Sequence, residues 1–162
     1  MAKAKVSKKL QQAIDSLVIN DVYLKSAQAE CEDDFDPKSA DSLEVLSVQQ
    51  MHIVLKSEVI QVDGDGQLVR IHIRLGARWV SQQEEDEEPD IKALIEGQFI
   101  AEYLVTDSIE QEAIDEYALK NASYHVWPYW REFLSSQCER LRLPRVVLPT
   151  VQFSKQPDPI GL

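Results

Sequence analysis

Residues 125–133 read His-Val-Trp-Pro-Tyr-Trp-Arg-Glu-Phe, and an apolar run that contains Pro144 and Pro149 follows at residues 141–153. The apolar positions of this region share one face of a helix: Val126, Trp130, Phe133, Leu134 and Leu141. Because proline is tolerated only in the first turn of a helix or at a kink, this helix should begin near Val126. The two later prolines predict an extended segment. The sequence therefore predicts an aromatic-rich helix that packs against an extended apolar segment.

Four stretches before this helix have the composition of β-strands. They cover residues 18–30, 43–62, 69–79 and 91–106. The third alternates most clearly, and its apolar positions, which should face a core, are Val69, Ile71, Ile73, Leu75 and Trp79. Its polar positions, which should face water, are Arg70, His72, Arg74 and Arg78. In the fourth stretch, one face carries Ile95, Phe99, Ala101, Tyr103 and Val105.

The predicted strands are joined by loops, with no crossover helix between them. Residues 33–41 contain Pro37, which is excluded from a central strand, and residues 63–66 (Asp-Gly-Asp-Gly) form a turn. Residues 81–90 are too acidic to bury apolar area. Four consecutive strands with such connections predict an antiparallel meander. Gly76 and Gly97 lie inside strands, which indicates a bulge or the close approach of another backbone.

Two further helical segments are predicted. The first has Ser7 as its N-cap and one apolar stripe: Val6, Leu10, Ala13, Ile14 and Leu17. The second opens with a capping box between Ser108 and Gln111 and runs to about Leu119. The predicted fold class is α+β, a four-stranded antiparallel sheet meander followed by helices packed on one face. We expect an N-terminal amphipathic segment at residues 1–17, one domain at 18–153 and a short flexible tail at 154–162.

Size and charge narrow the classes of function. The chain has 162 residues, 44% of them hydrophobic, which fits a single globular domain. Its formal net charge of −11 argues against nucleic-acid binding, which needs a basic surface, and against an anionic membrane surface. The N-terminal residues lack the apolar core of a secretory signal, and no stretch approaches the roughly 20 apolar residues of a membrane span. Cys31 and Cys138 stand far apart, so we expect a reduced, cytoplasmic protein with no membrane insertion.

The sequence shows no grouping of catalytic residues. His52, His72 and His125 fall on separate elements, and a surface role suits His72 better than a catalytic one. The turn that starts at Asp63 resembles the opening of a calcium loop, but Arg74 occupies the twelfth position, where a bidentate Glu is needed. We therefore expect no catalytic activity, no cofactor and no metal. A small-molecule-binding enzyme remains an alternative without a residue constellation behind it.

The order of these elements resembles the SecB export chaperones. The resemblance rests on the helix opening Trp-Pro-Tyr-Trp-Arg-Glu at residues 127–132 and on Leu-Pro-Arg-Val-Val-Leu-Pro-Thr-Val-Gln-Phe at 143–153. The strand motifs at residues 22–25 (Val-Tyr-Leu-Lys) and 94–96 (Leu-Ile-Glu) are similar to the first and fourth strands of the family. The likeness covers roughly residues 18–153. It implies a homotetramer, a dimer of dimers, that binds unfolded polypeptides in apolar grooves without ATP.

The resemblance also implies two sets of functional residues. Candidates for the client groove are Val22, Leu24, Trp127, Trp130, Phe133, Val146, Val147 and Leu148. The three aromatic residues among them fit core or tetramer packing better than client contact, because a helix of this period is usually part of a core. Candidates for docking the translocase ATPase SecA are Glu30, Leu94 and Glu96. Ser26 stands where the family usually has an Asp, which removes one charge from that docking face.

Two departures from the family bear on the partner. Residues 154–162 leave no room for the short helix and basic-ended tail with which family members grip the ATPase, and the N-terminal amphipathic segment is an addition. Both suit divergent SecB-like proteins, some of which shield a labile antitoxin in a toxin–antitoxin system. The expected function is an ATP-independent holdase for unfolded chains. The alternative is a dedicated chaperone or adaptor for one partner, such as an antitoxin.

Overall fold

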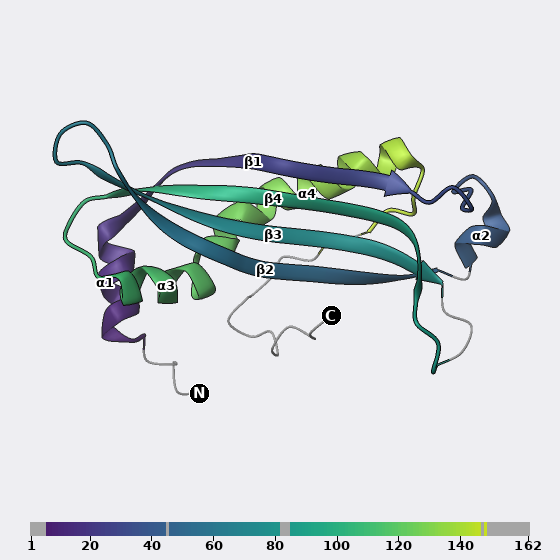
Figure 1. Cartoon of the computed structure of the whole chain (residues 1–162), viewed down its shortest axis with the longest axis horizontal. Helices are drawn as coiled ribbons and strands as arrows, with labels where there is room; N and C mark the ends of the chain where they lie inside the picture. Colours follow the sequence, from purple (N-terminus) through teal and green to yellow (C-terminus); the bar gives the residue numbers. More distant parts are fainter. Residues whose placement is uncertain (1–5, 45, 82–84, 147, 149–162) are drawn as a thin grey trace.

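The computed structural model describes residues 6–44, 46–81, 85–146 and 148, which form a twisted four-stranded antiparallel sheet with helices at its two ends and behind it (Figure 1). The strands are β1 (Leu17–Cys31), β2 (Leu46–Gln61), β3 (Gln67–Ser81) and β4 (Asp90–Val105). The helices are α1 (Lys8–Ser16), α2 (Ala40–Glu44), α3 (Gln111–Lys120) and α4 (Ala122–Leu141). The predicted α+β class with a four-stranded antiparallel sheet is confirmed.

The strand order is β1-β4-β3-β2, which departs from a simple meander. Strands β2, β3 and β4 follow one another as hairpins, whereas β1 lies beside β4, the last strand of the chain. This is a Greek-key arrangement. The connection from β1 to β2 is long enough to cross the end of the sheet, and it contains α2, which the loop prediction for residues 33–41 missed. Strand β2 accordingly begins at Leu46 instead of residue 43.

Strand β1 carries two irregularities that explain its mixed sequence pattern. Its pairing with β4 shifts between Ile19 and Asp21 and again between Leu24 and Ser26. Each extra residue reverses the alternation of side chains between the two faces of the sheet. As a result Val22 and Leu24 face the same side as the buried Ala101 and Phe99, which lie opposite them on β4.

Helix α1 begins as predicted. The Ser7 hydroxyl oxygen accepts a hydrogen bond from the backbone N–H of Leu10 at 3.0 Å, which is an N-cap, and the same hydroxyl donates to Glu116 of α3 at 2.7 Å. Leu10 and Ala13 are buried in the same core as the sheet residues. The N-terminal helix therefore packs against α3 as part of the one core, as the pairing of these helices in Figure 1 shows. The predicted tail at 154–162 lies outside the described residues, and the division at residue 17 remains a prediction.

Two predicted helix starts are wrong. Helix α3 begins at Gln111, three residues after Ser108, and its N-cap residue Glu110 makes no side-chain cap. The backbone N–H of Ser108, which a capping box would pair with the Gln111 side chain, instead donates to the Asp107 carboxylate at 2.8 Å. Helix α4 begins at Ala122, four residues before Val126, so Pro128 lies inside it. Packing against the sheet outweighs the missing N–H of one proline.

The core lies between the sheet and α4, with α1 and α3 closing one end. Strands β3 and β4 contribute alternate, fully buried side chains, as predicted: Val69, Ile71, Ile73, Leu75, Trp79, Ile95, Phe99, Ala101 and Tyr103. Helix α4 covers them with Val126, Trp130, Leu134 and Cys138. Burial of this much apolar area is the main favourable term in folding and fixes the position of α4 on the sheet.

Candidate functional site

Helix α4 ends in a turn that sends the chain back along the helix. Arg142 adopts the left-handed conformation (φ 59°, ψ 30°). The backbone N–H of Leu143 donates to the Cys138 carbonyl at 2.9 Å and that of Arg142 to the Glu139 carbonyl at 3.3 Å. This is the Schellman pattern, and the buried Leu143 and Cys138 supply its apolar contact. The backbone of Val146 then hydrogen-bonds to the Cys138 thiol, whose pKa is raised by burial and lowered in part by this bond.

A groove of about 300 Å³ lies between α4 and the returning segment. Four exposed residues of α4 form one wall: Pro128, Arg131, Glu132 and Ser135. Their spacing of i, i+3, i+4 and i+7 places them on one stripe of the helix. Arg145, Val146 and Leu148 form the other wall. The predicted aromatic helix and its extended sequel thus do meet in a groove, and its walls are both apolar and charged.

The aromatic residues of α4 divide between core and surface. Trp130 is 2% exposed, and its ring meets the ring of Phe99 edge-on, with 6.5 Å between the centroids. Phe133 is partly buried, and its ring centroid lies 6.2 Å from the centroid of Phe99 and 6.2 Å from that of Trp130. The two edge-on pairs, Phe99–Trp130 and Phe99–Phe133, stabilise the junction of helix and strand. Trp130 and Val22, both proposed for the client groove, are buried within the chain, so we assign them to packing.

Most of the remaining candidates for the client groove are more exposed to solvent. Leu24 is 42% exposed at the edge of the sheet, beside the aromatic cluster. Trp127 and Val146 are partly buried, while Leu148 lines the groove but is itself buried. Val147 lies outside the described residues. Leu24, Trp127, Phe133 and Val146 therefore remain accessible to a ligand, and their role in binding remains a prediction.

Sequence reasoning missed the exposed aliphatic side chains of β2, an edge strand of the sheet. Five of them in and just after this strand are 39–43% exposed: Val48, Ile53, Leu55, Val59 and Val62. Edge strands usually carry charges or prolines that prevent pairing with another chain. Strand β1, the other edge, exposes Val18, Ile19 and Leu24 but has two irregularities in its pairing, whereas half of the exposed positions of β2 are aliphatic. The signal in the sequence was the presence of β-branched residues at both odd and even positions of this strand.

The three candidates for SecA docking lie together on the sheet face opposite the helices. Glu30 of β1 pairs with Leu94 of β4, and Glu96 follows two residues along β4 on the same face. Glu30 is exposed, while Glu96 is half-buried and lies 3.1 Å from the Arg74 guanidinium. Ser26 also lies on this face, opposite Gln98. The structure groups these residues, and their docking role stays a prediction.

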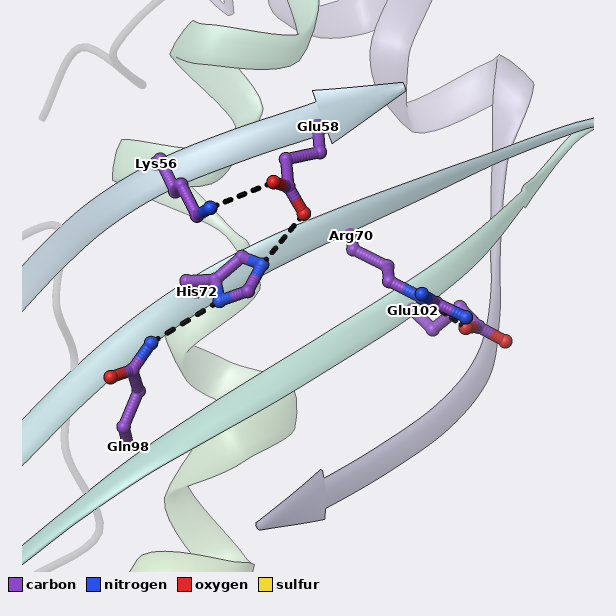
Figure 2. A network of polar contacts seen from close by, with 6 residues as sticks. All are labelled: Lys56, Glu58, Arg70, His72, Gln98 and Glu102. Atoms are coloured by element: carbon purple, nitrogen blue, oxygen red, sulfur yellow. Dashed lines mark hydrogen bonds and ion pairs between the residues drawn. The ribbon is translucent and has the colours of Figure 1, made fainter. Parts of the chain in front are cut away.

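His72 on the same face is buried, contrary to the expectation that it faces water. It is 3% exposed because neighbours from both flanking strands cover it (Figure 2). Its Nε2 lies 3.0 Å from Glu58 of β2, and the Gln98 amide of β4 donates to its Nδ1 at 3.2 Å. Lys56 also donates to Glu58 at 2.7 Å. The hydrogen bonds from Lys56 and His72 lower the pKa of the Glu58 carboxyl to about 2. Beside this network Arg70 donates to Glu102 at 2.7 Å, which lowers the pKa of that carboxyl.

The other two histidines join the sheet to α4. His52 of β2 lies 2.6 Å from the Ser123 hydroxyl, and His125 Nδ1 lies 2.8 Å from the Tyr103 hydroxyl of β4. Burial lowers the pKa of both histidines. Within the described parts of the chain, no group of three or more His, Cys, Asp and Glu side chains could hold a metal ion. None of the described helices is long and apolar enough to cross a membrane.

The fold has a SecB-like architecture. Among solved structures, the chain is similar to the SecB-like chaperone Rv1957 of Mycobacterium tuberculosis, determined in complex with a ChAD peptide from the Rv1956 HigA1 antitoxin. The TM-score is 0.67 at 18% sequence identity, over 90% of this chain and 97% of that one. No family model and no curated protein matches the sequence. At this identity, the likeness establishes the fold.

Proposed function

We propose that this protein is an ATP-independent chaperone that binds unfolded polypeptides and keeps them from aggregating. The observation that carries the proposal is the combination of a SecB-like fold with apolar side chains left open along β2 and beside α4. Exposed apolar surface of this kind marks interaction sites in proteins. It is also what an unfolded chain, with its own apolar residues exposed, can bind without a defined sequence.

The edge of β2 suits an extended client. Its outer backbone groups can pair with another strand, and main-chain hydrogen bonds give affinity that does not depend on the client sequence. The aliphatic side chains on both sides of this edge then add apolar contact. The chain's net charge of −11 keeps a loaded complex soluble, because complexes of like charge repel one another.

We expect a homotetramer, a dimer of dimers, that acts in the cytoplasm without enzymatic activity or a cofactor. SecA is a candidate partner through Glu30, Leu94 and Glu96, which lie on one face of the sheet. A dedicated chaperone for an antitoxin is the second candidate function, favoured because the similar SecB-like chaperone was solved with an antitoxin peptide.

Suppression of aggregation tests the proposal. A reduced, unfolding client is diluted into buffer without ATP, and its light scattering is followed with and without substoichiometric protein. We expect the native chain and Val6→Thr to slow the rise in scattering and the double variant Val48→Thr/Val59→Thr to slow it less. Val6 is also an exposed valine, but it precedes α1 and is not part of β2. No suppression at several-fold excess of the native chain contradicts a general holdase, and tight one-to-one binding of a single folded partner then supports the adaptor.

A further inference from the structure

The groove beside α4 holds two arginines that form no ion pair with any residue the structure describes. Arg131 and Arg145 line it from opposite walls, and neither takes part in the ion pairs found among residues 6–44, 46–81, 85–146 and 148. By contrast, Arg70 and Arg74 on the sheet are each paired with a carboxylate. The chain has 28 acidic residues for 17 basic ones, whereas the described lining of this groove has two guanidinium groups and one carboxylate, the opposite charge balance.

The same groove offers apolar contact between the two arginines. Pro128 on α4 and Val146 on the returning segment lie beside them, and Leu148 closes the apolar wall. A volume of about 300 Å³ accommodates one or two aliphatic side chains, at the lower end of ligand pockets. Glu132 is the one carboxylate among the described lining residues, so two positive charges there face a single negative one. The groove is thus a small apolar site with a net positive rim.

We propose that this groove selects client segments in which an aliphatic residue lies next to a carboxylate, with Arg131 and Arg145 as the residues that determine specificity. The inference rests on the proposed chaperone function and deepens it. The aliphatic side chain enters between Pro128 and Val146, and the neighbouring Asp or Glu receives hydrogen bonds from the guanidinium groups. Arginine binds a carboxylate through two parallel N–H donors, which a lysine cannot match.

The charge of the whole chain distinguishes a local preference for carboxylates from a general electrostatic attraction. A net charge of −11 attracts basic peptides and repels acidic ones at long range. At about 0.15 M salt, charges more than about 8 Å apart are largely screened, so the local arginines dominate over the distant carboxylates. A preference for acidic segments therefore cannot come from the general field of the protein. It requires a local positive site.

Fluorescence anisotropy with three labelled peptides tests the inference on the full chain. The peptides share one unstructured, leucine-containing sequence and differ at two positions beside the leucines, which carry Asp, Asn or Lys. We expect the Asp peptide to bind roughly three- to tenfold more tightly than the Asn peptide at 0.15 M salt, a range typical of partly exposed ion pairs. The Lys peptide should bind most weakly of the three.

Arginine variants test whether the groove causes the preference for the Asp peptide. Arg131→Gln/Arg145→Gln should abolish the preference for Asp over Asn, and Arg131→Lys/Arg145→Lys should restore part of it. The control is Arg140→Gln, because residue 140 lies nine positions from Arg131 and so on the opposite side of α4. Arg140 donates to Ser136, outside the groove, and this control should keep the full preference.

Several results would overturn the inference. Equal affinity for the Asp and Asn peptides, or tighter binding of the Lys peptide, rules out a carboxylate-selective site. A change in the mass of the assembly in Arg131→Gln/Arg145→Gln, with peptide selectivity unchanged, identifies the groove as a contact between copies of this chain. Binding of all three peptides without selectivity leaves the general holdase intact and removes only this inference. Failure to bind any of them, together with no suppression of aggregation, rejects both.

Discussion

At Gly97, the absence of a side chain leaves room for the Phe99 ring at the junction of the sheet and helix α4. A Cβ atom at this position would lie 2.9 Å from the Phe99 ring and 3.4 Å from Leu24. Phe99 cannot yield easily, because it is buried between Trp130 and Phe133. The strand glycine therefore marks the approach of an aromatic side chain, where the sequence had indicated a bulge or another backbone.

We predict that Gly97→Ala lowers the free energy of unfolding by about 1–3 kcal/mol through overpacking. Gly76→Ala is the matched control, because the one tight contact of its Cβ would be with the flexible end of Met51, at 3.1 Å. Replacing a strand glycine there should be close to neutral. Urea unfolding of the two variants checks this difference, and a Gly97→Ala variant as stable as the native chain would show that the ring can move aside.

The two histidines between sheet and helix predict a dependence of stability on pH. Burial lowers the pKa of His52 and of His125 below the value of about 6.5 for an exposed histidine. The unfolded chain therefore binds more protons below pH 6.5 than the folded chain does, and stability falls as the pH drops through that value. The free energy of unfolding in urea should be smaller at pH 5.5 than at pH 7.5.

The variant His52→Gln/His125→Gln should reduce this slope between pH 5.5 and 7.5. Glu58 does not interfere, because its lowered pKa of about 2 affects stability only below its ordinary value of 4.5. A native chain with equal stability at both pH values, or a variant with the native slope, would show that these histidines do not control the junction.

At the scale of elements, the end of α4 carries backbone strain. Arg142 takes the left-handed conformation that glycine adopts without penalty, in a Schellman turn whose two hydrogen bonds are formed. We predict that Arg142→Gly raises the free energy of unfolding by about 0.5–1 kcal/mol. Arg142→Ala keeps the strained conformation and should give no such gain. Thermal or urea unfolding of both variants decides, and equal effects of Gly and Ala would argue against strain at this turn.

The sequence predicts the regular parts of each element well and their boundaries less well. The alternation in β3 and β4 identifies the buried faces because both strands lie inside the sheet and one face of each is almost wholly apolar, whereas the other face mixes apolar and polar residues. Pro128 suggests too late a start for α4, since local preference cannot account for the burial of Ala122 and Ser123 against the sheet. The position of β1 beside β4, and the burial of His72 by Glu58 and Gln98, depend on partners distant in sequence.

The candidate site is predictable only in part for the same reason. The aromatic helix and the segment after it indicate that two walls meet, and the structure places them at one groove. Arg131 and Arg145 look like ordinary solvated residues until the turn at Arg142 brings their walls together. The aliphatic residues of β2 can be recognised as a candidate binding surface only once this strand is known to lie at an edge.

At the scale of the whole molecule, the proposed tetramer predicts a mass four times that of the 18.5 kDa chain. The exposed Tyr124 and Tyr129 of α4 and the open aliphatic residues at both sheet edges leave apolar area that association would bury. Light scattering coupled to size exclusion measures this mass directly. A single 18.5 kDa species at micromolar concentration would contradict the assembly and remove any groove that depends on a second copy.

The central claim is that the chain recognises the unfolded state of a client. The direct measurement is the affinity for one client in two forms, a permanently unfolded variant and the native folded protein, by titration calorimetry without nucleotide. We predict binding of the unfolded form with a negative heat-capacity change, because apolar surface is buried, and no binding of the folded form. Equal binding of both forms, or no binding of the unfolded form, would contradict the claim.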